Sequence, residues 1–160
     1  MKKLLTFIFL CCIFLQVNAM EPNQSYTLVV EGFDWGPAVH KVILNNESGI
    51  SDFSPAEFKV FASRSTDQGE IPASQRFGER DVIYAYTSDE NGNRTDAGQY
   101  LTLVLEVSPI LPLGSPIQYM RFGNRGGNFW IDYQLTIVHA KSNQTWNEEV
   151  GKIMPLVDEY

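Results

Sequence analysis

The stretch FWIDYQLTIVH, residues 129–139, decides the fold class because its apolar and polar side chains alternate along its length. A period of two places successive side chains on opposite faces of an extended strand. One face then carries the apolar set Phe129, Ile131, Tyr133, Leu135 and Ile137, and the other carries Trp130, Asp132, Gln134 and Thr136. The stretch therefore predicts one continuous strand with a buried face and a solvated face.

Similar short runs precede this strand, separated by clusters of Gly, Pro, Asn, Asp and Ser. They predict strands at residues 26–31, 39–44, 57–63, 81–87 and 99–107, with a last extended segment at 146–158. Residues 81–87 are apolar on both faces, which favours a central position in a sheet. No long segment shows a helical apolar period. We therefore predict an all-β protein, an immunoglobulin-like β-sandwich of about seven strands.

The N-terminus has the layout of a secretory signal peptide. Two lysines precede an apolar run at residues 4–15, and Val17-Asn18-Ala19 then supplies small residues where a signal peptidase reads. The run is too short for a membrane span, which needs roughly 20 residues. We expect residues 1–19 to be cleaved, leaving residues 20–160 as one secreted or periplasmic domain that does not bind a membrane.

Composition narrows the chemistry of this domain. Both cysteines, Cys11 and Cys12, lie in the leader, so the mature chain lacks disulfides, thiolate metal sites and a cysteine nucleophile. Removing the leader also takes the formal net charge from −7 to −9. An acidic chain without clustered Lys and Arg is a poor nucleic-acid binder, so we expect no such partner.

Motifs of hydrolysis and metal binding are lacking in the sequence. No G-x-S-x-G nucleophile motif occurs, and the two histidines, His40 and His139, show no metal-ligand spacing. His139 falls on the inward register of its strand, which predicts a satisfied core or strand-end histidine. We therefore predict no catalytic residue, no metal site and no cofactor.

The segment from Asp89 to Asp96 places oxygen side chains at alternate positions, as calcium loops do. Its glycine stands fourth rather than sixth, however, and the twelfth position is Tyr100 instead of glutamate. A hairpin turn in which Asn91-Gly92 supplies positive φ angles is the favoured interpretation. A calcium site remains the alternative.

Three longer stretches carry a family resemblance: EGFDWGPAVHKVIL (31–44), DVIYAYTSDENGNRTDAG (81–98) and FWIDYQLTI (129–137), followed by PLVDEY (155–160). Together and in this order they resemble the immunoglobulin-like N-terminal domain of secreted bacterial esterases, which are α/β-hydrolases of the prolyl-oligopeptidase and depolymerase type. In such enzymes a segment like PLVDEY leads into the catalytic domain. Residues 64–80 and 120–128 depart from the family pattern.

The resemblance implies a non-catalytic accessory domain that packs on a secreted α/β-hydrolase domain or on further copies of itself. Large apolar groups outside the clear strand pattern suggest a contacting patch of Asp34, Trp35, Pro37, Leu156 and Val157. A second hypothesis is a carbohydrate- or polymer-binding module whose stacking aromatics are Trp35, Trp130 and Trp146. A third is a structural envelope protein.

Overall fold

The computed structural model describes residues 24–155, which form two packed β-sheets and a projecting hairpin. One sheet has five strands in the order β11 (Glu148–Ile153), β1 (Ser25–Phe33), β2 (Gly36–Asn45), β6 (Tyr100–Leu105) and β5 (Val82–Ser88). The other has four, in the order β10 (Gln144–Trp146), β9 (Asp132–His139), β3 (Phe58–Ser65) and β4 (Phe77–Arg80). The hairpin joins β7 (Ile117–Phe122) to β8 (Arg125–Trp130).

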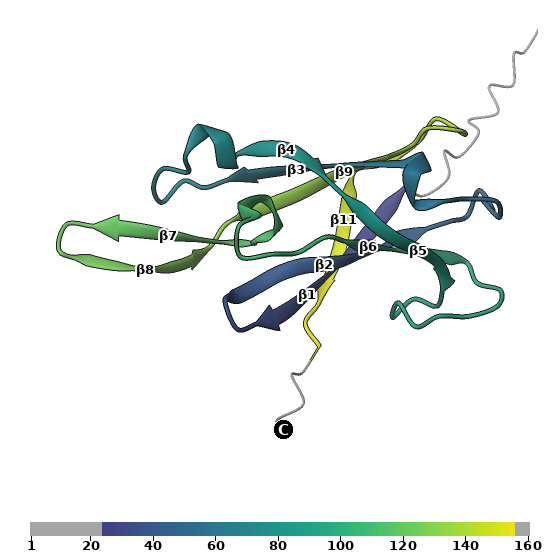
Figure 1. Cartoon of the computed structure of the whole chain (residues 1–160), viewed down its shortest axis with the longest axis horizontal. Helices are drawn as coiled ribbons and strands as arrows, with labels where there is room; N and C mark the ends of the chain where they lie inside the picture. The colour runs from purple at the N-terminus through teal and green to yellow at the C-terminus, as the bar shows by residue number, and fades with distance from the viewer. Residues whose placement is uncertain (1–23, 156–160) are drawn as a thin grey trace, which may run out of the picture.

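Figure 1 shows β3, β4 and β9 in one layer above β1, β2 and β6, with the β7–β8 hairpin extending sideways past both sheets. The only helical segments within residues 24–155 are three single 3-10 turns, η1 (Pro55–Glu57), η2 (Ala73–Gln75) and η3 (Pro112–Gly114). The predicted all-β, immunoglobulin-like sandwich is confirmed. The leader predicted at residues 1–19 lies outside the described residues.

The core lies between the sheets and consists of the alternating side chains that the sequence places inward. Each sheet contributes a buried row, and the fully enclosed members are Tyr26, Leu28, Val39, Val42, Leu44, Val60, Ala62, Leu101, Leu103, Leu105, Tyr133, Leu135, Ile137 and Trp146. Removal of apolar surface from water is the main stabilising contribution here, at roughly 25 cal/mol per Å².

Two predictions about strands are wrong. Residues 81–87 do not form a central strand, because β5 is the edge of its sheet, and Ile83 and Tyr84 remain exposed. The Arg94 guanidinium partly shields this face, at 5.6 Å from the Tyr84 ring centre and 6.0 Å from that of Tyr86. Residues 129–139 are not one strand either. The chain divides at Ile131, whose N–H donates to the Pro116 carbonyl, so β8 leaves the sandwich for the hairpin while β9 stays in it.

Arg80 connects the two sheets from a buried, inward-facing position on β4. Its Nη1 donates to the Val39 carbonyl of β2 (2.8 Å) and to the Tyr133 hydroxyl of β9 (3.0 Å). Its Nη2 donates to the Glu106 carbonyl (2.7 Å). The Tyr133 hydroxyl donates onward to the Leu113 carbonyl (2.8 Å), and burial raises the pKa of Tyr133. This network joins the two sheets through buried hydrogen bonds.

Arg64 holds the base of the projecting hairpin against the sandwich. Its guanidinium donates to the carbonyls of Ser115 (3.0 Å), Ile117 (2.9 Å) and Gln75 (3.0 Å). Burial lowers the pKa of Arg64, because a desolvated cation is less stable than a hydrated one. We refer to β7, β8 and their turn, residues 117–130, as the arm.

Candidate interaction surface

The turn between β1 and β2 presents the N-terminal part of the predicted patch. Asp34 and Trp35 form a two-residue turn between the paired residues Phe33 and Gly36. Gly36 has φ = 117°, a value that L side chains rarely adopt. The Trp35 ring stacks on Phe33 with centroids 4.7 Å apart, yet 48% of its surface remains exposed. The turn therefore holds a large aromatic ring in a defined position facing solvent.

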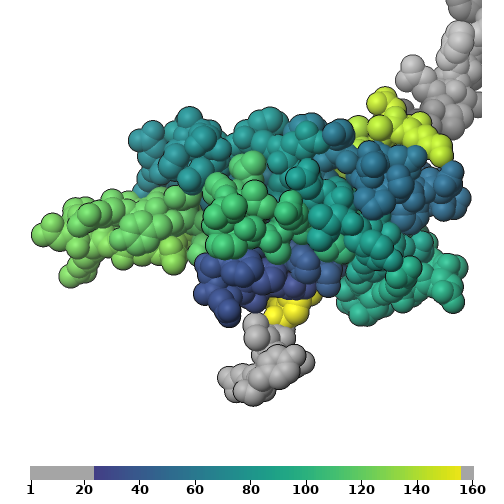
Figure 2. All heavy atoms as spheres, viewed as in Figure 1, coloured from purple at the N-terminus to yellow at the C-terminus, as the bar shows by residue number. Residues whose placement is uncertain are grey.

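The arm presents two further exposed aromatic rings on one of its faces. Tyr119 is 61% exposed and Trp130 is 52% exposed, and Trp130 pairs across the hairpin with Ile117. A side chain on Gly126 would meet the Tyr119 ring, so this glycine lets the ring lie against the strand opposite. Figure 2 shows the arm extending well beyond the rest of the described surface.

A cavity of about 220 Å³ lies between the β1–β2 turn and the arm. Trp35 and Pro37 line one side, and Ile117, Tyr119 and Asn128 line the other. The proline-rich segment at residues 107–115 completes the lining, and Ile110 beside it is 83% exposed. We call this cavity and its aromatic rims the hairpin groove.

The structure brings some predicted site residues together and separates others. Trp35 and Pro37 line the hairpin groove, and Asp34 is exposed in the turn beside them. Trp130 is on the groove-facing side of the arm, paired to Ile117. Leu156 and Val157 lie outside the described residues.

The prediction that Trp146 is a stacking aromatic is wrong. This side chain is only 1% exposed, and its Nε1 donates to the Asn45 carbonyl (2.6 Å). It follows a turn after β9 and pairs with Ile137, which places it on the inward face of the sheet. The position of Trp146 at the start of a predicted extended segment therefore did not indicate that its side chain is exposed.

Tyr119 and the proline-rich segment were missed as functional candidates from the sequence. The Gly-Arg-rich stretch at 120–128 masked the hairpin, because glycine weakens a strand pattern. The alternation in IQYMRF, residues 117–122, is the signal that could have revealed it. The closeness of Tyr119 to Trp35, by contrast, depends on tertiary contacts.

A family model for the esterase Ig-like N-terminal domain matches residues 25–152. The chain belongs to this family. Among solved structures it is similar to a thermostable esterase, with 18% identity and a TM-score of 0.50. That match covers 84% of this chain but only 36% of the esterase chain. No curated protein matches the chain.

This esterase Ig-like domain therefore corresponds to the N-terminal, immunoglobulin-like part of esterases and not to their catalytic domain. Residues 24–155 contain no group of three or more His, Cys, Asp or Glu side chains that could hold a metal ion. No helix in the same residues is long and apolar enough to cross a membrane.

The two histidines of the domain have structural contacts. His40 Nδ1 lies 2.5 Å from the Glu31 carboxylate, which also pairs with Lys41 at 3.3 Å. His139 is buried at the end of β9, as its register predicts, with Nδ1 2.8 Å from the Ser142 hydroxyl. Its Nε2 lies 3.6 Å from the Glu57 carboxylate and makes no hydrogen bond among the described residues.

The Asp89 segment forms the predicted turn. Asp89 Oδ1 accepts hydrogen bonds from the backbone N–H groups of Asn91 (2.9 Å) and Asn93 (2.8 Å), and Oδ2 accepts one from Asn93 Nδ2 (2.9 Å). These bonds, chiefly the one from the Asn93 side chain, lower the pKa of Asp89. Gly92 supplies a positive φ of 80°, but Asn91 does not, so that part of the prediction is wrong. The aspartate oxygens thus organise the turn itself.

Proposed function

We propose that this domain is a non-catalytic accessory domain that docks on an α/β-hydrolase catalytic domain through the hairpin groove. One observation carries the proposal. The described residues contain eleven exposed large hydrophobic side chains. Three of them, Trp35, Leu111 and Tyr119, line this groove, and two more are next to lining residues: Ile110 precedes Leu111, and Trp130 pairs with Ile117. Exposed apolar groups concentrated in one place are typical of an interaction site.

The direction of the last strand supports the same surface. β11 runs parallel to β1, and Ile153 near its end pairs with Val29 of β1. The chain therefore leaves β11 toward the end of the sandwich that carries the β1–β2 turn (Figure 1). A catalytic domain joined there by a short linker would begin close to Trp35.

The aromatic rims have the chemistry of binding hot spots. Trp and Tyr bring large apolar area and few rotatable bonds, and they dominate the binding energy of many interfaces. The stacking of Trp35 on Phe33 and the support of Tyr119 by Gly126 hold both rings in position before contact. Preorganisation of this kind lowers the entropic cost of binding.

The test uses isothermal titration calorimetry of this domain against the α/β-hydrolase domain of a secreted esterase from the same organism. We expect Trp35→Ala and Tyr119→Ala each to raise Kd about tenfold or more, since about 1.4 kcal/mol corresponds to a factor of ten. Phe77→Ala is the matched control, because Phe77 is exposed on β4 and does not line the groove. The domain alone should not hydrolyse a short acyl ester. Absence of binding, or binding unaffected by both substitutions, would contradict the proposal.

A polymer-binding module is the second candidate, and it rests on the same rings. Trp35, Tyr119 and Trp130 are exposed, and Asn128 and Ser115 add polar groups to the groove. Retention on an insoluble polysaccharide that is lost on Trp35→Ala would favour this function over docking. Retention unaffected by Trp35→Ala and Trp130→Ala would exclude it.

A further inference from the structure

A cavity of about 280 Å³ lies at the end of β3, where the loop to β4 begins. Arg64, Arg76, Ser65 and Thr66 line it, together with the largely exposed Glu70. None of the residues that line this cavity lines the hairpin groove. We call it the arginine pocket, because two of its lining residues are arginines.

The loop that forms the arginine pocket is held in place by packing against the arm. Ile71, which also lines the pocket, is buried in a second, smaller apolar cluster with Met120 of β7 and Ile131. Gly69 lies so close to the arm that a Cβ there would be 2.6 Å from the Met120 sulfur. The Arg76 Nε also donates to the Ile71 carbonyl (2.7 Å). These contacts give the pocket a defined shape.

Arg64 is a buried cation that has no carboxylate partner in the described part of the chain. It is only 3% exposed, and its four side-chain hydrogen bonds all go to neutral oxygens, the carbonyls of Gln75, Ser115 and Ile117 and the Gln118 Oε1. A guanidinium has five N–H donors, so at least one N–H of Arg64 has no acceptor within residues 24–155. Burial of a charge is costly unless an opposite charge accompanies it.

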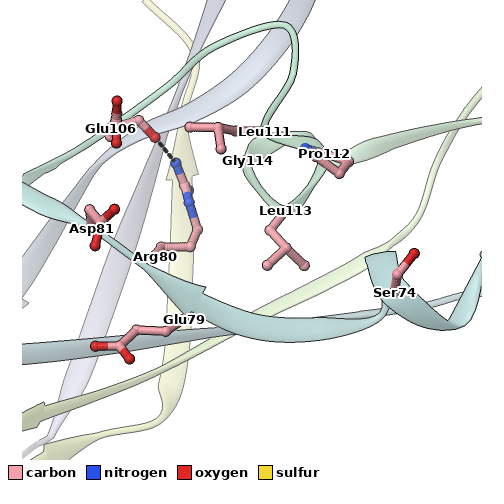
Figure 3. Close-up of a pocket in the computed structure, with 9 residues that line it drawn as sticks. All are labelled: Ser74, Glu79, Arg80, Asp81, Glu106, Leu111, Pro112, Leu113 and Gly114. Carbon is pink, nitrogen blue, oxygen red and sulfur yellow. Dashed lines mark hydrogen bonds between the residues drawn. The ribbon is translucent and has the colours of Figure 1, made fainter.

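Arg80, the other buried arginine of the described residues, lines a cavity of the opposite charge. That cavity has a volume of about 160 Å³, and the carboxylates of Glu79, Asp81 and Glu106 are part of its lining (Figure 3). Three carboxylates outnumber one arginine there, so a further anion would be repelled. In the arginine pocket, by contrast, two arginines accompany the single carboxylate of Glu70, so the net charge is positive.

The carboxylate of the arginine pocket is already engaged, and donors remain free. Glu70 Oε1 accepts a hydrogen bond from Arg76 Nη2 (3.2 Å) at the solvent-exposed rim, and Arg76 Nη1 makes no hydrogen bond within residues 24–155. Asp67, beside Thr66 in the chain, and Asp132, paired with β3, do not line the pocket. Thr66 Oγ1 accepts a backbone N–H (3.1 Å), which leaves its hydroxyl proton to donate.

We propose that the arginine pocket binds a tetrahedral oxyanion, a phosphate or sulfate group. Arg64 and Arg76 supply positive charge, and the hydroxyls of Ser65 and Thr66 supply further donors. Four donating side chains suit the three or four oxygens of such a group better than the two oxygens of a carboxylate. The pocket has room for the group and several waters, since one water takes about 30 Å³ in the liquid.

This site goes beyond the proposed docking on a hydrolase, because it lies in a different cavity and takes a different ligand. The exposed side chains of Arg76 and Glu70 leave its rim open, so the oxyanion can enter as a free ion or as a group carried by a sugar. Arg64 also donates to the Ser115 and Ile117 carbonyls at the base of the arm. An anion beside Arg64 would offset the buried charge at this junction.

The test is a nuclear magnetic resonance titration of the nitrogen-15-labelled domain with sodium phosphate and with sodium sulfate, against sodium chloride at matched ionic strength. We expect the amide signals of Ser65, Thr66 and Gly69 to shift saturably with phosphate and sulfate and not with chloride. Glucose 6-phosphate and glucose distinguish the two sources of the group. Tighter binding of glucose 6-phosphate than of inorganic phosphate would support a sugar-borne group, and weaker binding would support the free ion.

Two substitutions at the pocket test the assigned donors. Arg76→Gln should raise Kd about tenfold or more, because it removes a charge-assisted hydrogen bond, and Thr66→Val should raise Kd several-fold. Lys141→Gln is the matched control, because it removes the same charge from a similarly exposed side chain that pairs with Asp52 outside the pocket. Arg64→Gln would also release the base of the arm, so the Arg76 and Thr66 variants provide the decisive comparison.

Two outcomes would overturn the proposal. One is the absence of saturable shifts at the three amides with both phosphate and sulfate. The other is binding that Arg76→Gln and Thr66→Val leave unchanged while circular dichroism shows both variants to be folded. Neither result bears on docking to a hydrolase, which is tested through Trp35 and Tyr119 at the hairpin groove.

Discussion

The interior of the sandwich and the arm end of the molecule use the same residue types in opposite ways. Trp146 is enclosed and its indole N–H has an acceptor, whereas Trp130 projects half-exposed from the arm. Arg80 donates three hydrogen bonds between the sheets, whereas Arg121 donates none in the described structure. Residue type alone therefore does not separate structural from functional positions here. The two kinds of position differ in whether their polar groups have hydrogen-bond partners within the domain.

The contrast has a physical origin in the lack of cysteine within residues 24–155. A sandwich without an inter-sheet disulfide must hold its layers by packing and by buried hydrogen bonds, and a buried polar group is stabilising only when its partners are all present. The polar groups of the arm do not need partners within the domain, because its exposed rings and guanidinium groups are hydrated. We expect the sandwich interior to determine the stability of the domain and the arm end to determine what it binds.

The largest expected difference between the regions is in their tryptophans. Trp146→Ala should lower the free energy of unfolding by about 3–5 kcal/mol, because it leaves a cavity between the sheets and frees the Asn45 carbonyl. Trp130→Ala should change it by less than about 0.5 kcal/mol. Urea unfolding followed by circular dichroism measures both values. Equal losses would mean that the arm is part of the cooperative core.

The arginines should differ in the same direction. Arg80→Leu should destabilise the domain by about 2–4 kcal/mol, since it leaves the oxygens of Val39, Tyr133 and Glu106 without their donor. Arg121→Leu should be close to neutral in the same urea titration. A small effect at Arg80 would show that packing alone joins the sheets.

The sequence was sufficient to predict which faces are buried. Residues 26, 28 and 30, residues 58, 60 and 62, and residues 101, 103 and 105 all lie inward as their alternation indicates. Alternation reports the burial of one face because a strand has a strict period of two. Alternation contains no information on which strands pair with each other in a sheet, so the edge position of β5 could not be predicted from it.

The candidate site was predictable only in part. Trp35 and Pro37 were identified because they interrupt a strand pattern, but their turn is far in sequence from the proline-rich segment and the arm that follows it. The hydrogen bonds of Arg64 to Ser115 and Ile117, across more than fifty positions of the chain, hold that segment and the base of the arm on the sandwich, where they face the turn. Such long-range contacts follow from the fold and leave no local signal, which is also why the burial of Trp146 was missed.

A tyrosine pair tests the contrast at smaller magnitude and through pH. Tyr26 accepts a hydrogen bond from the Leu135 N–H (2.8 Å), and burial raises its pKa from 10.0 to about 12. Its protonated form is favoured in the folded state, so its contribution to stability is complete below about pH 10 and is lost as the pH rises toward 12.

Tyr26→Phe should therefore cost about 1 kcal/mol at neutral pH and weaken the loss of stability at alkaline pH. Part of that loss should remain, because burial also raises the pKa of Tyr133. Thermal unfolding between pH 7 and pH 11 measures the slope, and Tyr119→Phe, on the exposed arm, is the control. An unchanged slope in Tyr26→Phe would show that Tyr26 does not titrate with unfolding.

The smallest expected effect on stability is at Gly126. A substitution there should change binding at the hairpin groove while leaving the free energy of unfolding almost unchanged. A Cβ at this position would clash with the Tyr119 hydroxyl end, which belongs to a flexible, exposed side chain that can move aside. Gly126→Ala should therefore change the free energy of unfolding by less than about 0.5 kcal/mol. The displaced ring should nevertheless weaken binding at the hairpin groove several-fold. Gly127→Ala is the matched control, because its nearest contact is an ordinary 3.4 Å to Phe129. If both substitutions left binding unchanged while Tyr119→Ala reduced it, the orientation of the ring would be unimportant and only its presence would matter.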